Sequence, residues 1–357
     1  MYNGEERFIG VLTQERATRL INSYDVRFDI LFIDEAHNIL KNNSRNHLLS
    51  RFIMLNYKKN PNQRLLYLSP LMNDSKNLKT KFTSEGQIFE SSIKHNLKAY
   101  DVFYLDKKGR LNLYNRFSDE QYQVDKNIQF NDYIINKAQE KNFIYNYRPR
   151  NVEQIAKKLS MSIEILENET LNSISVTISN EISEDIDLVD LIKKGIIYLH
   201  GKQPTILKEY LEYQYKEIQE LKFVIANSVI LEGINFPIDT LFITSTYALN
   251  VKDLNNLIGR VNRLNYVFNS SLSKLVSEIH FVDSVEFTDK RSDMSNKLSL
   301  LREHSFKDEN KNPLLDNYNV EELKLPKEEL VKQKEKDSKL IKFTEFLINE
   351  NDTSLES

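Results

Sequence analysis

The segment L-F-I-D-E-A-H-N-I-L, from Leu31 to Leu40, is the strongest sequence signal of the fold that we expect for this chain. Its first three residues are apolar and end at Ile33, which predicts a strand buried on both faces, as in a parallel sheet. Asp34 and Glu35 follow at the carboxyl end of that strand, where open α/β sheets bind their ligands. Adjacent carboxylates suit a hard cation and a water molecule, with Asp34 holding Mg²⁺ and Glu35 polarising the water. The alternative is that Asp34 only caps the next helix.

The string from Asp34 to His37 resembles the Walker B motif, or DEAH box, of superfamily 2 helicases. The resemblance implies an α/β fold with tandem RecA-like domains, each built on a parallel sheet. It also implies that ATP binding and hydrolysis open and close the two domains on a single strand of DNA or RNA, with Mg²⁺ held by Asp34. In such a protein His37 would belong to the nucleotide site.

Length and composition limit the classes of protein that fit. A chain of 357 residues predicts two domains, and its 40% of hydrophobic residues can supply their cores. The net charge of −3 leaves nucleic-acid binding to local basic patches. The absence of cysteine excludes disulfides and thiolate metal sites. No apolar run approaches the roughly 20 residues that span a bilayer, and the N-terminus lacks the apolar core of a signal peptide. We therefore expect a cytoplasmic protein without membrane contact.

Segments on either side of the DEAH box complete the expected first domain, residues 1–125. The apolar run Phe8–Leu12 predicts a strand, which Thr13 and Arg16 follow. A similar element in the family contacts the nucleic-acid backbone. The alternative is that Thr13 caps a helix and Arg16 lies on its solvated face. After the box, Arg64–Leu68 predicts a second buried strand.

The end of the first domain carries a second motif. Ser69 stands where the family has the first residue of its S-A-T coupling element, which implies a contact near the nucleotide. Pro70 and Leu71 depart from that element, and Pro70 removes a backbone donor. Alternating apolar and polar residues in Asn96–Tyr114 predict a hairpin that finishes the first domain. The polar segment Phe117–Asn131 is then expected to connect the domains.

The expected second domain, residues 126–285, begins with a helix and the strand Asn142–Asn146. A helix over Val152–Leu159 follows it. Further segments of the same pattern predict strands at Lys194–His200, Phe223–Asn227 and Leu241–Thr244 and a helix at Leu207–Leu221. A strand that ends in His200 resembles the theta-polymerase and exosome-type subfamily, in which this histidine lies by the nucleic-acid path. The alternative is a satisfied polar residue.

The string E-G-I-N-F-P, from Glu232 to Pro237, closely resembles helicase motif V. Gly233 permits a backbone turn that a side chain would block, and Pro237 makes the exit from that turn rigid. The resemblance implies that Gly233 lies at the nucleotide and that Ser228 and Asn235 contact nucleic acid. An amide such as that of Asn235 can lie close to a phosphate.

The string N-L-I-G-R-V-N-R, from Asn256 to Arg263, resembles helicase motif VI, Q-x-x-G-R-x-G-R. Arg260 and Arg263 are three residues apart and would share a helix face, from which they could stabilise charge on a transferring phosphoryl group. Asn256 and Gly259 would contact the nucleotide. Asn262 stands where glycine is usual. This string and the motif V context also resemble the helicase of bacterial Hachiman-type antiphage defence.

The sequence lacks one part that such an enzyme needs. The phosphate-binding loop, G-x-x-x-x-G-K-[ST], should precede the Walker B strand, and none of the 33 residues before Asp34 form it. The pair Gly201-Lys202 is followed by Gln203 and lies in the second domain. We therefore expect the C-terminal portion of a helicase core, with an incomplete first domain. Residues 286–357 are expected to form a charged helical tail, exposed to solvent or bound to a partner.

The sequence thus predicts an ATP-dependent helicase or translocase, or a truncated or split part of one. Without the phosphate-binding loop, the chain alone should have little or no ATPase activity. A separate N-terminal helicase fragment could complete it, and a nuclease is another conceivable partner. The alternative is a catalytically inactive, helicase-derived module that binds nucleic acid or another protein. A degraded remnant without function is the third possibility.

Overall fold

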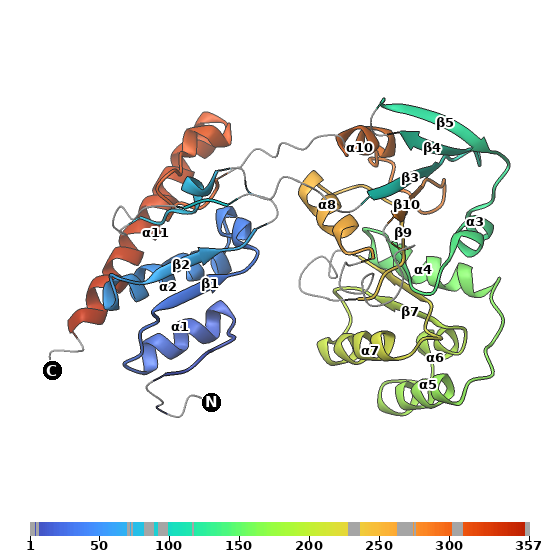
Figure 1. The fold of residues 1–357 in the computed structure, drawn as a ribbon, viewed down its shortest axis with the longest axis horizontal. Helices are drawn as coiled ribbons and strands as arrows, with labels where there is room; N and C mark the ends of the chain where they lie inside the picture. The colour runs from blue at the N-terminus through green and yellow to red at the C-terminus, as the bar shows by residue number, and fades with distance from the viewer. Residues whose placement is uncertain are drawn as a thin grey trace. The chain divides into compact units, whose positions relative to one another are not determined.

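A computed structural model provides the structure of the protein. It describes residues 4, 7–69, 72, 74–81, 89–91, 99–115, 118–227, 236–262, 274, 276–301 and 310–353. The chain forms two compact units. Unit 1 comprises Met1–Ser92 and Ser305–Ser357, and unit 2 comprises Ile93–His304 (Figure 1). The chain therefore leaves unit 1, builds unit 2 and returns to unit 1.

Unit 1 is a small α/β unit around two parallel strands. Its elements are α1 (Gln14–Ser23), β1 (Ile30–Ile33), η1 (Ala36–Leu40), α2 (Ser44–Lys59), β2 (Arg64–Tyr67), η2 (Ser75–Leu78), η5 (Val320–Leu323) and α11 (Lys327–Thr353). Strands β1 and β2 are parallel, with Ile30 opposite Arg64 and Ile33 opposite Tyr67. Helix α2 packs against both α1 and α11. The DEAH segment lies in the turn that leaves β1.

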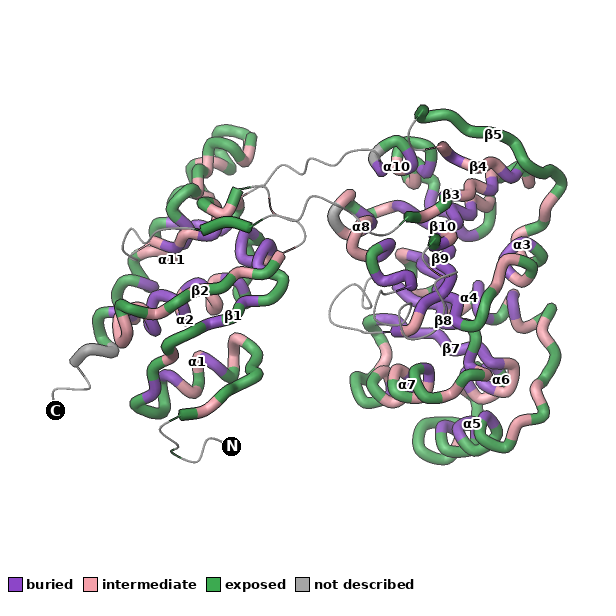
Figure 2. Tube along the Cα trace, viewed as in Figure 1, coloured by how far each residue is buried: buried purple, intermediate pink, exposed green. Residues whose placement is uncertain are grey.

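The β1–β2 pair is buried on one face only, so the prediction of two strands buried on both faces is wrong. Leu31 and Ile33 are buried among residues from α1, α2, η1 and the C-terminal segment. On the opposite face, 69% of Phe32 and 47% of Ile30 are exposed (Figure 2). The described helices of unit 1 thus cover one side of the sheet. An apolar run in the sequence does not show which face of its strand is left without a packed helix.

The predicted strand at Phe8–Leu12 is also absent. These residues are irregular, and Ile9 and Val11 are almost fully exposed. The apolar run therefore pairs with no described strand.

The C-terminal residues form part of unit 1, which corrects the expectation of a separate tail over residues 286–357. Leu314 and Leu315 are fully buried in its two apolar clusters. From α11, Thr344 Oγ1 accepts a hydrogen bond from Arg51 Nε at 3.1 Å, and the carbonyl of Ile348 accepts one from Lys58 Nζ at 2.8 Å. Thr344 and Ile348 of α11 are buried, and Leu340 and Ile341 pack partly against the same apolar cluster, whereas Val331, Phe343 and Phe346 are exposed.

The described residues of unit 2 form an eight-stranded sheet. Its strands are β3 (Ala99–Leu105), β4 (Leu111–Asn115), β5 (Glu120–Asp125), β6 (Asn142–Tyr145), β7 (Ile196–Leu199), β8 (Phe223–Ala226), β9 (Thr240–Ile243) and β10 (Val276–Val282). Its described helices are α3 (Phe130–Lys137), α4 (Pro149–Ser160), α5 (Glu169–Glu181), α6 (Leu188–Ile192), α7 (Thr205–Glu217), α8 (Val251–Gly259) and α10 (Met294–Leu300). The strand order is β5-β4-β3-β10-β9-β6-β8-β7. Strands β3, β10, β9, β6, β8 and β7 run parallel, whereas β4 and β5 are antiparallel to their neighbours.

The strands predicted for the second domain are confirmed. β6, β7, β8 and β9 are four-residue strands in which each residue is buried. Helices α4 and α7 follow β6 and β7 as expected. The fold class is therefore α/β with a mostly parallel sheet.

The predicted division of the chain differs from the structure. The hairpin expected in Asn96–Tyr114 is formed by β3 and β4, but β3 pairs with β10 and thus belongs to unit 2. Val102 and Leu105 are buried in the core of that unit. The expected connector Phe117–Asn131 contains β5, which pairs with β4. The first unit therefore does not extend over residues 1–125, and unit 2 exceeds the expected residues 126–285.

Among the described residues, no helix is both long enough and apolar enough to cross a membrane.

The packing of unit 1 yields a stability prediction. Leu315→Ala should lower its free energy of unfolding by about 2–4 kcal/mol, because the substitution leaves a cavity among Ile33, Ile39 and Ile53. Val331→Ala, at an exposed position of α11, should change it by less than about 0.5 kcal/mol. Urea unfolding followed by hydrogen exchange of the α2 amides reports unit 1 separately. Equal effects of the two substitutions would show that the C-terminal segment is no part of this core.

Candidate functional site

The DEAH turn lies at the carboxyl ends of β1 and β2. The parallel ladder continues one step beyond the strands, because Leu68 N donates to Ile33 O and Ala36 N donates to Leu68 O, both at 2.9 Å. Asp34 and Glu35 are exposed at this edge. Two carboxylates are thus held on a turn anchored to both strands.

The turn itself is bent by an unusual backbone conformation. Glu35 has a φ of +49°, in the left-handed region, which is costly for a residue with a side chain. Asp34 Oδ1 accepts a hydrogen bond from Glu35 N at 2.9 Å. Glu35, and not Asp34, is the N-cap residue of η1. The alternative that Asp34 only caps the next helix therefore does not describe this turn.

His37 connects this turn to the end of β2. The ring is buried, and its Nδ1 lies 3.1 Å from Ser69 Oγ and 3.5 Å from Glu35 Oε2. The structure therefore brings together three predicted residues, Glu35, His37 and Ser69, from two separate motifs. Because the His37 ring lies beside both side chains, a movement of Glu35 after β1 would displace Ser69 after β2, and the reverse.

The carboxylates of the DEAH turn suit a metal ion that enters the site already bound to a ligand. Among the described residues, no group of three or more His, Asp or Glu side chains could hold a metal ion. Mg²⁺ commonly binds through one or two carboxylates, water and substrate phosphates. Asp34 alone satisfies that requirement, so the turn suits Mg²⁺ bound to a nucleotide and not a site made only of protein ligands.

Motif VI lies at the end of α8, and here the helix prediction needs correction. Helix α8 ends at Gly259, and Arg260 is in the following turn with only 7% of its surface exposed. Arg263 lies outside the described residues. The expectation that Arg260 and Arg263 share a helix face is therefore wrong at Arg260. Asn256, on the last turn of α8, is half-buried.

Asn262 explains how the chain tolerates a residue other than glycine in this turn. Its φ is +45°, and asparagine is among the residues that adopt the left-handed region most readily. The residue is buried. Its backbone N donates to Ile238 O at 2.7 Å, and its side chain lies 3.3 Å from Ser277 Oγ. These contacts tie the turn after α8 to the amino ends of β9 and β10.

The remaining nucleic-acid candidates have different surroundings. Thr13 is the N-cap of α1, and its Oγ1 accepts a hydrogen bond from Arg16 N at 3.4 Å. Arg16 is exposed. The cap that the alternative foresaw is thus present, and an exposed Arg16 side chain stays compatible with a phosphate contact. In motif V, Ser228, Gly233 and Asn235 lie outside the described residues.

His200 is a buried and well-satisfied residue. Its Nδ1 accepts a hydrogen bond from Lys202 N at 3.3 Å, which places the ring hydrogen on Nε2. Nε2 lies 2.9 Å from Glu153 Oε1 on α4. The ring also stacks on Tyr198. These contacts are those of a satisfied polar residue, which is the alternative given above for His200.

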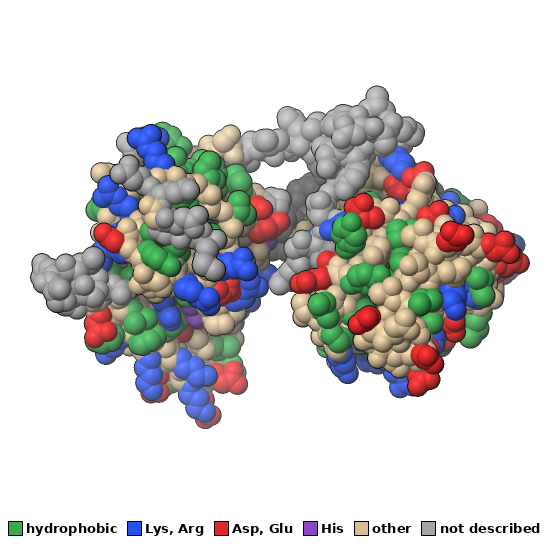
Figure 3. All heavy atoms as spheres, turned by 90° about the horizontal axis from the view of Figure 1, so that it is seen from below, with side chains coloured by type: hydrophobic (Ala, Val, Ile, Leu, Met, Phe, Trp, Pro, Cys, Tyr) green, Lys and Arg blue, Asp and Glu red, His purple; other side chains and the backbone are tan. Residues whose placement is uncertain are grey.

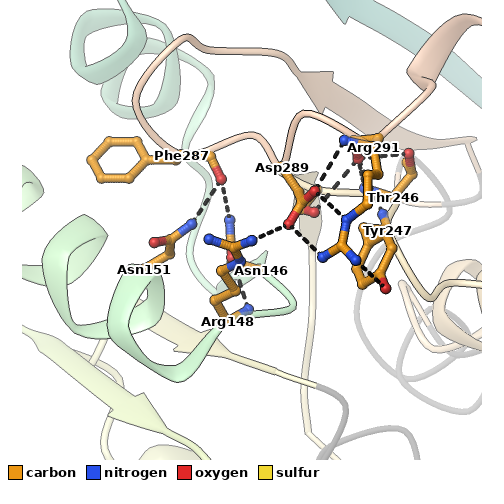
Figure 4. Close-up of polar contacts among 10 residues, drawn as sticks. Asn146, Arg148, Asn151, Thr246, Tyr247, Phe287, Asp289 and Arg291 are labelled. Atoms are coloured by element: carbon orange, nitrogen blue, oxygen red, sulfur yellow. Dashed lines mark hydrogen bonds and ion pairs between the residues drawn. The ribbon is translucent and has the colours of Figure 1, made fainter.

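The structure also assembles a cluster that the sequence did not predict. Arg148, Tyr247, Asp289 and Arg291 meet in the loops after β6, β9 and β10 (Figure 4). Asp289 Oδ2 accepts hydrogen bonds from Arg148 Nη2 at 2.6 Å and from Arg291 Nη2 at 3.3 Å. We call these four residues the arginine clamp. One local signal exists, because Arg148 lies three residues after the end of β6.

Several contacts hold the arginine clamp in place. Asp289 Oδ1 accepts from Arg291 Nε at 3.1 Å and from Arg291 N at 3.0 Å. The Arg291 side-chain hydrogen bond, followed by the backbone one, lowers the pKa of Asp289 well below its usual range. Arg291 Nη1 donates to Tyr247 Oη at 2.7 Å, and the guanidinium lies over the Tyr247 ring at 3.6 Å. Asp289 therefore stays ionised between two cations.

The surface charge elsewhere is mixed. Lys and Arg side chains and Asp and Glu side chains both occur on the face of each unit seen in Figure 3. This agrees with the small net charge and leaves recognition of an anion to local clusters.

The backbone of Asn262 yields a second prediction. Asn262→Val should lower the free energy of unfolding of unit 2 by about 2 kcal/mol or more, since a β-branched residue tolerates a positive φ poorly. Asn262→Gly should cost less, because glycine adopts this φ freely and only the side-chain hydrogen bonds are lost. Urea unfolding followed by hydrogen exchange of the β9 amides compares the two. A larger loss for glycine would assign the residue's role to its side chain instead.

No protein-family model matches the sequence, and a search of curated proteins found no relative. Among solved structures, the fold is similar to that of the Mycobacterium smegmatis helicase Lhr bound to single-stranded DNA and AMP-PNP. The two share 14% sequence identity with a TM-score of 0.46, and the match covers 76% of this chain and 29% of Lhr. The chain therefore spans less than a third of that protein.

Proposed function

We propose that this chain is part of an ATP-dependent helicase or translocase of superfamily 2 that acts on single-stranded DNA or RNA. The observation that carries the proposal is the DEAH turn. It presents Asp34 and Glu35 at the carboxyl edge of parallel strands and joins them through His37 to Ser69. Open α/β sheets bind nucleotides at this edge. A protein that responds to its nucleotide requires such a link, because a change at the nucleotide must reach the end of β2.

The proposed roles follow from the chemistry of each side chain. Asp34 would hold the Mg²⁺ that accompanies ATP, and the metal would neutralise charge on the phosphates. Glu35 would orient the attacking water and accept its proton. Its carboxylate is exposed and fixed beside His37 by the left-handed turn. His37 and Ser69 would pass a change at the nucleotide to the end of β2.

Arg260 and Arg263 are the proposed groups that stabilise charge in the transition state. The Arg260 side chain is buried at the end of α8. Its proposed role therefore requires that the turn after α8 change conformation when the nucleotide binds. Asn256, Gly259 and Gly233 would complete the nucleotide contacts by analogy with the family motifs.

A partner segment should complete the nucleotide site. No phosphate-binding loop is present in this sequence, so backbone amides and a lysine for the β- and γ-phosphates must come from elsewhere. The uncovered face of the β1–β2 pair supports this part of the proposal. Ile30, Phe32, Leu66 and Leu68 are exposed on unit 1, whereas parallel strands are normally covered on both faces. We propose that an α/β segment with the missing loop packs there.

The absent loop also favours a second candidate function. A helicase-derived module without ATPase activity would keep the fold of unit 2 and bind nucleic acid alone. The two candidates differ in one property, which is whether turnover appears when the missing segment is supplied.

Measurements of ATP hydrolysis test the proposal. The chain alone, with single-stranded DNA or RNA, should show little or no turnover. A mixture with a fragment that carries the phosphate-binding loop should be active. Glu35→Gln should then reduce that activity by about 100-fold or more, because it removes the group that accepts the proton of water.

The matched control is Glu345→Gln, at an exposed position of α11, which should leave turnover unchanged. Stimulated turnover by the pure chain would contradict the prediction. Inactivity of the mixture, combined with strand binding by the folded chain, would favour the inactive module.

A further inference from the structure

The arginine clamp occupies the edge of the sheet where the parallel strands of unit 2 end. Its residues come from the loops after β6, β9 and β10, which are neighbours in the order β10-β9-β6. Asn146 ties the three loops together, since its Nδ2 donates to Thr244 Oγ1 at 2.8 Å and to Phe287 O at 3.0 Å (Figure 4). Its Oδ1 accepts from Arg148 N at 3.0 Å. Buried hydrogen bonds thus fix the base of the clamp.

The clamp holds two cations on one buried anion. The side chain of Asp289 is 4% exposed, whereas those of Arg148 and Arg291 are 54% and 58% exposed. Two guanidinium groups and one carboxylate leave a net charge of +1. Each guanidinium has five N–H donors. Arg148 donates through Nη2 to Asp289, and Arg291 divides its side-chain donors between Asp289 and Tyr247. Donors therefore remain on the exposed sides of both groups.

The clamp is also rigid before a ligand arrives. The Tyr247 ring supports the plane of Arg291 at 3.6 Å, and Tyr147 packs edge-on against Tyr247. Ser292 Oγ accepts hydrogen bonds from Thr246 N and Tyr247 N at 2.6 and 3.1 Å. Ala248, which follows Tyr247 in the sequence, has a φ of +59°. This is a strained conformation of the kind that clusters at functional sites. Pre-organised guanidinium groups lose less side-chain entropy on binding.

We propose that Arg148 and Arg291 together bind one phosphate of a single-stranded nucleic acid at the carboxyl edge of unit 2. Planar guanidinium forks match phosphate oxygens, and the exposed face of a supported arginine can also stack on a base. The ligand class depends on the function proposed above. The site is distinct from motif VI, because Asn262 lies at the opposite, amino ends of β9 and β10.

Strand binding by the full chain tests the clamp. Fluorescence anisotropy with a labelled oligonucleotide at several salt concentrations would be measured for the unaltered chain, for Arg148→Gln and for Arg148→Gln with Arg291→Gln. The double variant should bind about tenfold more weakly at 0.1 M salt, with a salt slope smaller by about 1, because one phosphate contact is lost. The single variant leaves the Arg291–Asp289 pair intact, so it guards against loss of folding, and it should show a smaller change in the same direction.

Arg110→Gln is the matched control. Arg110 is 52% exposed and pairs with a single aspartate, Asp106, in the turn between β3 and β4, and its loss should leave binding unchanged. Unaltered binding by both clamp variants would overturn this inference and leave the proposed function intact. Failure of the unaltered chain to bind any strand would overturn both. Loss of mononucleotide binding, with strand binding retained, would assign the clamp to nucleotide phosphates and also overturn the inference.

Discussion

Parallel pairing of short apolar strands is the constraint on which both units depend. In such a sheet every strand ends at the same edge, so the residues that follow different strands meet there whatever their distance in sequence. In unit 1 this rule brings His37 to Ser69, after β1 and β2. In unit 2 it brings Arg148 to Asp289, after β6 and β10. The polar groups of both sites are therefore products of the same arrangement.

Strands with all residues buried were predictable, because a short, mainly apolar run between polar turns has few other solutions. β6, β7, β8 and β9 are of this kind. The pairing of β3 with β10 was not predictable, since it joins segments that lie far apart in the sequence and carry no local signal of each other. β5 was missed because it is polar and exposed throughout, although Tyr122 and Val124 show the alternation typical of a strand.

The candidate site, like the fold, could be predicted from the sequence only in part. The position of Asp34 and Glu35 at a strand end followed from the apolar run before them. The contact between His37 and Ser69 required the parallel pairing of β1 and β2, which the sequence implied only through a family resemblance. The arginine clamp could not be derived, because Asp289 and Arg291 follow a strand whose neighbours are set by tertiary packing. The helix expected through Arg260 failed because Asn262 ends the turn in a left-handed conformation.

Glu35 and Ala248 both have a positive φ, and the backbone strain serves a different purpose at each residue. Glycine would adopt a positive φ without cost, whereas another residue costs roughly 1–2 kcal/mol. At Glu35 the extra cost keeps a carboxylate beside His37, so a side chain is required there. Ala248 has no polar side chain that could justify the same cost. Its strain instead serves the path of the loop, which directs the preceding Tyr247 under Arg291. Strain at the first site thus positions a carboxylate, and strain at the second supports the ring on which the Arg291 guanidinium rests.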